Sequence, residues 1–397
     1  MRSTNEYLKE RQVPTEQEIE MFLFLLRTSL WGSAADDRQV PDLSQVRMAA
    51  LWQLAKEQTV EGLIAESLQK LYKYKDVSDA SALPNFLKLG MQMSYQHQHL
   101  NDTIVFLFDY LKKKDFFPIL LKGQGNAARY PNPFLRQCGD IDIYIGKKDF
   151  ERARRSAAEL VGEEAIDKAD ISEKHLHFTY DRLPIEYHRI AERLPNPIPH
   201  RRFQAFTEYW LTPERCDQVL INNHKTSIPN RQFNVVYVFN HTWHHLIIGG
   251  IGVRQICDWC MLLHEAAGKI DIDQLEKDLK QLHLLKQWQI LGHIAVNKLG
   301  LPQDEMPLAN NECGEKAERA WQMIISGGNF GNFGASRNHS GVKNIIIYKL
   351  ISLKCHAHHL SSLYAISKED AIWGVWLVLH DGLIDVYEKL SKGKFTK

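Results

Sequence analysis

Two aspartates in one short apolar run constrain the fold of this chain most. Asp140 and Asp142 are separated by a single residue, and Ile141, Ile143 and Ile145 alternate with them. Because successive side chains of a β-strand point to opposite faces, this alternation predicts a strand with one buried face and one face that carries both carboxylates. Two carboxylates on one face can share a divalent cation, so the sequence predicts a metal site on this strand.

A third carboxylate lies in a later run of the same kind. Glu186 and His188 alternate with Ile185 and Tyr187, and the apolar Ile190 follows, so the acid and the histidine are predicted to lie on one strand face. We expect Glu186 to complete the metal site if the two strands are neighbours. The alternatives are an ordinary exposed strand acid for Glu186 and a packing role for His188.

The hydrophobic period of the sequence changes along the chain. Helical periodicity covers 15–114 and returns beyond the prolines at 195–199. Between these two parts, short β-rich runs alternate with a helical stretch over 148–160. A strand pair is also predicted around 218–228, with Asn222-Asn223 near its turn. The predicted β-rich runs of the central part are 117–121, 141–145, 175–180 and 185–190.

These changes of period predict an α+β protein with three parts. A small mixed-sheet core over 116–230 would be flanked by an N-terminal helical region over 1–115 and a C-terminal helical domain over 231–397. The glycine-rich and asparagine-rich stretch 327–334 is predicted to be a linker, because little in it can anchor a core.

Composition limits the class of protein and of partner. The chain has 397 residues, 44% of them hydrophobic, and a formal net charge of +1. This charge lacks the positive excess of proteins that hold long nucleic acids, so we do not expect such a partner. The N-terminus lacks the apolar core of a signal peptide, and the apolar stretch 371–379 is too short to span a bilayer. Six scattered cysteines indicate reduced thiols. We therefore expect a cytoplasmic protein that does not span a membrane, of open oligomeric state.

A glycine turn precedes the aspartate strand. Gly123-Gln-Gly-Asn-Ala-Ala128 matches the dinucleotide-binding pattern G-x-G-x-x-A, in which an acid follows about 20 residues later. A helix long enough to cross a sheet cannot form here, because Pro131 and Pro133 end it. Asp140 also begins the next strand, whereas the dinucleotide-binding acid ends one. Dinucleotide binding is therefore the less favoured interpretation.

The motifs together resemble the polymerase β-like nucleotidyltransferase superfamily. Its core is an apolar strand, a glycine turn, a short helix and an Asp-x-Asp strand, which here are Leu120-Leu-Lys-Gly-Gln124 and Asp140-Ile-Asp142. With Tyr130-Pro-Asn-Pro133, Arg136 and Ile185-Glu-Tyr-His188, the chain is similar to the uncharacterised bacterial nucleotidyltransferase family with long helical flanks. The specific resemblance covers 117–188.

The resemblance implies a function and roles for the acids. The expected enzyme moves a nucleoside monophosphate from an NTP to a hydroxyl of a small molecule, sugar or protein. Asp140 and Asp142 would hold the triphosphate-bound Mg²⁺, or Mn²⁺. Glu186 would complete a second metal position and help to deprotonate the acceptor hydroxyl.

One position departs from the superfamily. A serine is expected after Gly123, and this chain has Gln124. The Gln124 amide could still bind a phosphate oxygen, and backbone N–H groups at the start of the helix would supply an anion site. The departure keeps a competing hypothesis open: a catalytically silent nucleotide-binding or interaction protein, similar to one half of a toxin–antitoxin pair. A metal-dependent phosphohydrolase would leave the Lys122-Gly123 turn unexplained.

Basic and histidine side chains supply further candidates. Lys122 and Arg136 are candidate phosphate ligands, with a structural salt bridge to the acid cluster as the alternative for Arg136. A helical segment then follows that we expect to flank the cleft, with helix packing as the alternative for its histidines. In this segment His241 and His245 are four residues apart, so they share one helix face. Arg254 and Asp258 have the same spacing, and we expect them to form a local ion pair.

Overall fold

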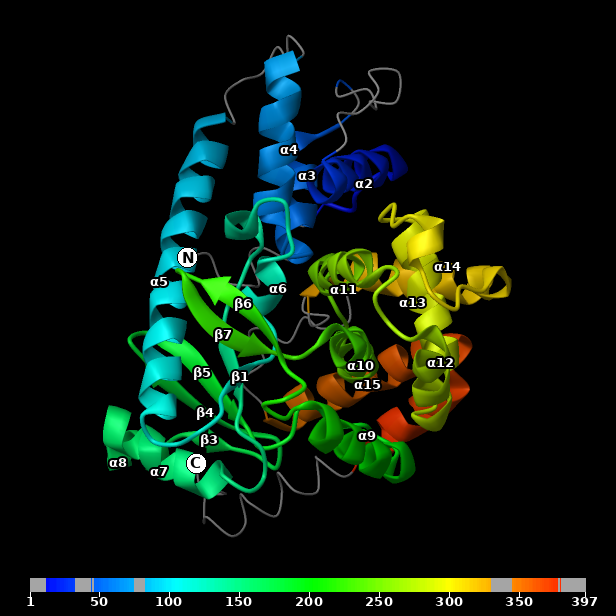
Figure 1. Ribbon diagram of the computed structural model, residues 1–397. Helices are drawn as coiled ribbons and strands as arrows, with labels where there is room; N and C mark the ends of the chain where they lie inside the picture. The colour runs from blue at the N-terminus through cyan, green and yellow to red at the C-terminus, as the bar shows by residue number, and fades with distance from the viewer. Residues whose placement is uncertain are drawn as a thin grey trace.

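The computed structural model describes residues 12–32, 44, 46–74, 83–329, 345–377 and 379. In the described part of the chain four helices precede the sheet, and Figure 1 shows the last of them as a long rod beside it. A capping box starts the first helix: the Thr15 side chain accepts from the Glu18 N–H, and the Glu18 carboxylate accepts from the Thr15 N–H. The four helices are α2 (Glu16–Trp31), α3 (Met48–Glu57), α4 (Glu61–Tyr74) and α5 (Leu83–Lys112).

The central sheet has five strands in the order β1-β2-β5-β4-β3. Strands β2 and β5 are parallel, whereas the other neighbouring pairs are antiparallel. The parallel register places Asp142 beside Glu186, so the two strands are neighbours, which is the condition for a shared site. This mixed sheet between helical regions confirms the α+β fold class. The strands are β1 (Ile119–Leu120), β2 (Ile141–Tyr144), β3 (Asp170–Ile171), β4 (His175–Tyr180) and β5 (Leu183–His188).

One face of the sheet is apolar and the other is polar. Ile141, Ile143 and Ile185 are buried in a hydrophobic cluster that also contains residues of α5 and of α7 (Phe150–Val161). Because neighbouring residues alternate, the opposite face carries Asp142 and Glu186. The polar face is therefore free to form a site. The short segments around this sheet are α6 (Gln124–Ala127), the 3₁₀ turn η4 (Pro133–Leu135) and α8 (Glu163–Asp167).

A hairpin follows helix α9 (Pro197–Trp210) and leads into the C-terminal helices. Its strands β6 (Asp217–Ile221) and β7 (His224–Ile228) are joined by Asn222-Asn223, and both asparagines have positive φ, at 48° and 63°. Two positive φ angles fit the tight turn that the sequence predicts here. The C-terminal elements are α10 (Arg231–Ile248), α11 (Val253–Ala266), α12 (Ile272–Gln281), α13 (Leu285–Asn297), η5 (Gln303–Glu305), η6 (Asn311–Cys313), α14 (Gly314–Gly327) and α15 (Ile345–Ile366).

The N-terminal and C-terminal helices share one hydrophobic cluster. Buried side chains of α2, α3 and α4 belong to the same cluster as those of α10, α11, α13 and α14. Polar contacts join the two regions as well, since the Trp31 indole N–H donates to the carbonyl of Leu299 at 2.7 Å. The domain boundaries at 115 and 230 remain predictions.

Within the described residues, no helix combines the length and apolar character needed to cross a membrane. Of the predicted linker 327–334, residues 330–334 lie outside the described part.

Candidate functional site

A glycine turn places Lys122 at the polar face of the sheet. Gly123 has φ 56° and ψ −118°, a backbone conformation that side chains disfavour, and a Cβ there would lie 3.3 Å from the carbonyl oxygen of Asp140. The strands on either side of the turn are antiparallel. A dinucleotide-binding unit needs parallel strands joined by a full helix, so that alternative is excluded.

Three carboxylates converge on the polar face. Asp140, Asp142 and Glu186 offer oxygen atoms that lie within 4.8 Å of one another. Repulsion by Asp142, together with burial, raises the pKa of Asp140. Burial alone would raise the pKa of Asp142, but Lys122 and a hydrogen bond from His188 hold it well below its usual range. Three acids at this separation form an acidic cluster that can hold a metal ion.

His188 ties two of the acids together. Its ring is fully buried, and Nε2 lies 2.8 Å from Asp142 Oδ1 and 3.1 Å from Glu186 Oε2. Burial would lower the pKa of His188, but the hydrogen bonds to both carboxylates raise it. The histidine that the sequence places on the face of Glu186 is therefore a direct neighbour of the acids.

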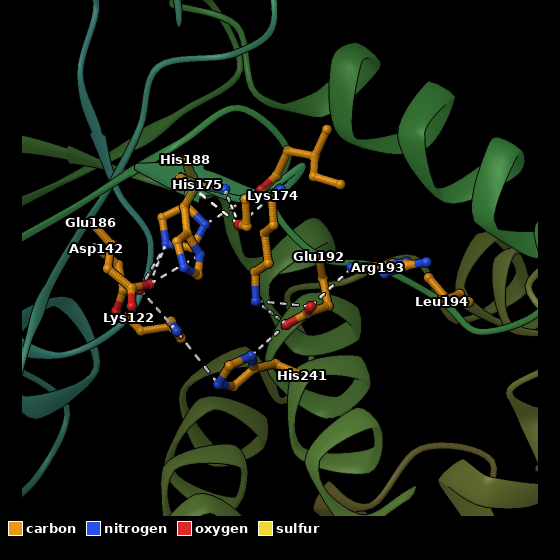
Figure 2. A network of polar contacts seen from close by, with 12 residues as sticks. Lys122, Asp142, Lys174, His175, Glu186, His188, Glu192, Arg193, Leu194 and His241 are labelled. Atoms are coloured by element: carbon orange, nitrogen blue, oxygen red, sulfur yellow. Dashed lines mark hydrogen bonds and ion pairs between the residues drawn. The ribbon is translucent and has the colours of Figure 1, made fainter. Parts of the chain in front are cut away.

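Lys122 begins a chain of polar contacts that crosses the site (Figure 2). Its Nζ lies 3.0 Å from Asp142 Oδ1 and 3.4 Å from His241 Nε2. On the other side of the ring, His241 Nδ1 donates to the buried Glu192 carboxylate at 2.5 Å, and Lys174 donates to the same carboxylate at 2.9 Å. Burial and the charge of Lys122 lower the pKa of His241 to about 4, so this imidazole is neutral near pH 7.

A cavity of about 430 Å³ opens between the polar face of the sheet and helices α10 and α11. Its size is within the range of small-molecule sites. The three carboxylates, Lys122 and Gly123 line it, whereas His188 is fully buried and is not part of the lining. The residues of the helical segment that we expect to flank the cleft line it too, namely His241, His245, Arg254 and Asp258. The other polar residues of the lining include Asn126, Arg136, Lys174, His175 and Gln255.

Arg136 and Asp258 form a buried ion pair in the cavity wall. Arg136 donates to Asp258 through Nε at 3.0 Å and through Nη2 at 2.5 Å, and the Tyr130 hydroxyl donates to the same carboxylate at 2.7 Å. The expected local pair between Arg254 and Asp258 is therefore wrong, because Asp258 is paired across the cavity wall. The alternative for Arg136, a salt bridge to the acid cluster, is wrong as well, because the carboxylate that Arg136 binds is that of Asp258.

Arg254 is left without a carboxylate partner among the described residues. Its Nη1 donates to the carbonyl of Gln137 at 2.6 Å, while its buried Nε has no hydrogen-bond partner in that part of the chain. Burial and the neighbouring Arg136 lower the pKa of Arg254, although a guanidinium keeps its charge near pH 7. A half-buried cation in the cavity wall can bind an anion.

The expected contact of the Gln124 amide with phosphate is wrong. Gln124 Nε2 donates to Asn101 Oδ1 at 2.6 Å and lies 3.1 Å from His97 Nδ1, so the side chain points toward α5 and does not line the cavity. The expected anion site at the start of α6 is reduced too, because the N–H groups of 125–127 donate to carbonyls of the same turn. Asn126 lines the cavity instead, and its buried Oδ1 has no hydrogen-bond partner among the described residues.

Four residues of the site were not predicted from the sequence. His175 lies in a predicted strand, and the pairing of β4 with β5 would have placed it beside His188. Asn126 lies in the segment Gly123–Ala128, but only the course of α6 shows which side chain of this segment faces the cavity. Lys174 and Glu192 flank strand ends in irregular segments, where no periodicity indicates direction.

Comparison with known families agrees with this geometry. A family model described as uncharacterised nucleotidyltransferase matches residues 44–300, which include the whole sheet and helices α10 and α11. No curated protein and no solved structure matches the chain.

Proposed function

The chain belongs to the family of uncharacterised nucleotidyltransferases, and from this premise we propose that it transfers a nucleoside monophosphate from an NTP to a hydroxyl group with the help of Mg²⁺. The observation that carries the proposal is the convergence of Asp140, Asp142 and Glu186 at the cavity. Nucleotidyl transfer needs such carboxylates on rigid elements to bind metal. Here a parallel strand pair fixes two of them side by side.

The donor set fits Mg²⁺. Asp140, Asp142 and Glu186 offer the oxygen ligands that this ion prefers, and the mutual repulsion that raises the pKa of Asp140 would be relieved by a cation. When bound, the metal would neutralise triphosphate charge and make the acceptor hydroxyl more acidic. The same oxygen ligands would also suit Mn²⁺.

The phosphate groups would be held by cations of the cavity wall. We assign this role to Lys122 and Arg254, since Lys122 lies beside the acids and the Arg254 guanidinium has no carboxylate partner among the described residues. Arg136 would act differently, because its bidentate pair with Asp258 fixes the wall and occupies its donors. Glu192 holds His241 against Lys122, and thereby orients the lysine toward Asp142.

The acceptor would be a hydroxyl of a small molecule, a sugar or a protein. A net charge of +1 gives no support for a long nucleic acid as acceptor. Six cysteines scattered along the chain favour reduced thiols, which supports a reducing compartment and hence the cytoplasm as the place of action.

Calorimetric titration with each of the four common NTPs, with and without Mg²⁺, tests the proposal. We expect one NTP to bind in a metal-dependent manner and Asp140→Asn to weaken that binding by at least about 10-fold, because a metal ligand is lost. Asp140 is the best ligand to replace, since Asp142 also holds Lys122 and His188. Asp167→Asn, at the exposed end of α8, is the matched control and should bind like the wild type.

The competing hypothesis predicts a different result. A catalytically silent nucleotide-binding or interaction protein would bind NTP without metal, or not at all, and Asp140→Asn would have no effect. Either result would contradict the proposed enzyme.

A further inference from the structure

Two imidazoles converge on Glu186 beside the acidic cluster, and the proposed function uses neither of them as a metal ligand. His175 faces His188 across the antiparallel pair of β4 and β5, so both rings lie on the polar face of the sheet. Figure 2 shows the two rings next to Glu186 and Asp142. The ligand atoms of His175, Glu186 and His188 lie within 4.8 Å of one another.

The separations between these atoms fit a single ion. His188 Nε2 lies 3.1 Å and His175 Nδ1 lies 3.5 Å from the same oxygen, Glu186 Oε2. Ligand atoms that each lie about 2.0–2.1 Å from a tetrahedral ion stand roughly 3.3–3.4 Å apart. The separations of both imidazole nitrogens from Glu186 Oε2 therefore lie close to those between ligands of one ion.

Further contacts of the rings support a ligand role. His175 Nδ1 is buried and has no hydrogen-bond partner in the described part of the chain. His188 Nδ1 lies 3.4 Å from the carbonyl oxygen of Ile190, the kind of outer contact that orients the other ring nitrogen of a metal-binding histidine. Asp142 Oδ1, at 2.8 Å from His188 Nε2, offers a fourth donor nearby.

The place of these residues gives an ion access. His175 and Glu186 line the cavity, while His188 is fully buried behind them. An ion could enter from the cavity and keep one coordination position open toward a ligand there, as catalytic metal sites do.

We propose that His175, Glu186 and His188 bind a divalent transition-metal ion such as Mn²⁺ or Zn²⁺ in preference to Mg²⁺. Imidazole nitrogen suits these ions, whereas Mg²⁺ prefers oxygen ligands throughout. The inference rests on the proposed function only in that Glu186 is shared with the acidic cluster. The site would then have two unlike metal positions, an all-oxygen one at Asp140 and Asp142 and a mixed one at the histidines.

Titration of the metals alone, without nucleotide, tests this inference on the full chain. Calorimetry with Zn²⁺ and Mg²⁺ should show that Zn²⁺ binds the wild type at least about 10-fold more tightly than Mg²⁺, whereas Mn²⁺ is less informative because it also suits the acidic cluster. Equal affinity for Mg²⁺ would overturn the inference, and this comparison needs no variant.

A matched pair of histidine variants locates the ion. His175→Asn should weaken Zn²⁺ binding by at least about 100-fold, the upper range for loss of an outer partner of a metal ligand. His177→Asn should leave it unchanged: His177 lies on the same strand and face, but its Nδ1 contacts the other carboxylate oxygen, Glu186 Oε1, and His177 is not part of the group of ligand atoms that includes His188. Equal effects of both variants, with circular dichroism showing both folded, would overturn the inference.

Asp140→Asn separates this inference from the proposed function. The variant should keep tight Zn²⁺ binding while it loses Mg²⁺-dependent NTP binding. Metal-dependent NTP binding without preference for transition metals would overturn the inference and leave the proposed function intact. Selective Zn²⁺ binding without any NTP binding would support the inference and contradict the proposed function.

Discussion

At the scale of single residues, alternation along a strand was sufficient to predict the acids. Asp140 with Asp142, and Glu186 with His188, follow a pattern that a single strand imposes, so the shared face of each pair could be predicted without a structure. The pairing of β2 with β5, which brings Glu186 beside Asp142, could not be predicted from either strand alone. The direction of Gln124 could not, because it depends on polar partners supplied by α5, more than 20 positions earlier in the chain. The partner of Asp258 was missed for the same reason, since Arg136 approaches it from a different segment.

A buried acid outside the site gives the pH dependence of stability. Glu18 accepts hydrogen bonds from the N–H, Nε and Nη2 of Arg47, and its side chain is 1% exposed. The side-chain hydrogen bond from Arg47 lowers the pKa of Glu18 to about 2. Because the folded-state pKa is depressed, the stabilisation is present above the unfolded value and is lost as the pH falls toward 2.

We therefore expect Glu18→Gln to lower the free energy of unfolding by about 2 kcal/mol at pH 7, after allowance for the half-exposed Arg47. At pH 3 the difference from the wild type should fall to about half. Urea unfolding of both proteins at the two pH values measures this difference in the free energy of unfolding. Glu20→Gln, exposed on the same helix, is the control and should change little. A difference that stays constant with pH would contradict the account.

At the scale of elements, period and turn chemistry predicted most strands and helices. The strand 175–180 agrees at both ends with β4, and Asn222-Asn223 forms the predicted turn. Strand β3 was not predicted, because two exposed residues carry no alternation. Contacts between elements were not predictable either, since a hydrophobic period shows which face is buried but not which element covers it.

Two helical glycines test the packing of elements directly. A Cβ on Gly62 of α4 would lie 2.4 Å from the carbonyl oxygen of Leu135, whereas a Cβ on Gly90 of α5 would meet nothing within 4 Å. We expect Gly62→Ala to destabilise the protein by about 1–3 kcal/mol through overpacking. Gly90→Ala should stabilise it by about 0.5–1 kcal/mol, because alanine is the better helix residue. Urea unfolding compares them, and similar effects would show that α4 does not pack closely on η4.

At the scale of the whole molecule, the two helical regions form one structure. The buried Gln58, at the end of α3, donates to the carbonyl of Ile325 at 3.1 Å and accepts from the N–H of Val253 at 3.0 Å. One side chain thus joins the N-terminal helices to α11 and α14. The sequence predicted two separate helical flanks and gave no sign of their shared core, since contacts across some 200 residues leave no local pattern.

Replacement of Gln58 should therefore weaken the entire protein. Gln58→Leu would leave a buried N–H and a buried carbonyl unpaired, at a cost of about 1–3 kcal/mol. Tryptophan fluorescence and circular dichroism should still report one coincident unfolding transition. Gln92→Leu, at an exposed position of α5, should stay within about 0.5 kcal/mol of the wild type. Two unfolding transitions that do not coincide would indicate that the helical flanks fold independently.

The reaction itself is tested most directly by the bond that is broken in the NTP. With Mg²⁺ and a mixture of small-molecule acceptors, the proposed transfer releases pyrophosphate and leaves an α-phosphate label on the acceptor. We expect both products from the wild type, and a loss of at least about 100-fold in Asp140→Asn and in Glu186→Gln, because each removes a charge that holds metal. Release of orthophosphate from the γ position, or pyrophosphate release that survives both substitutions, would contradict the account.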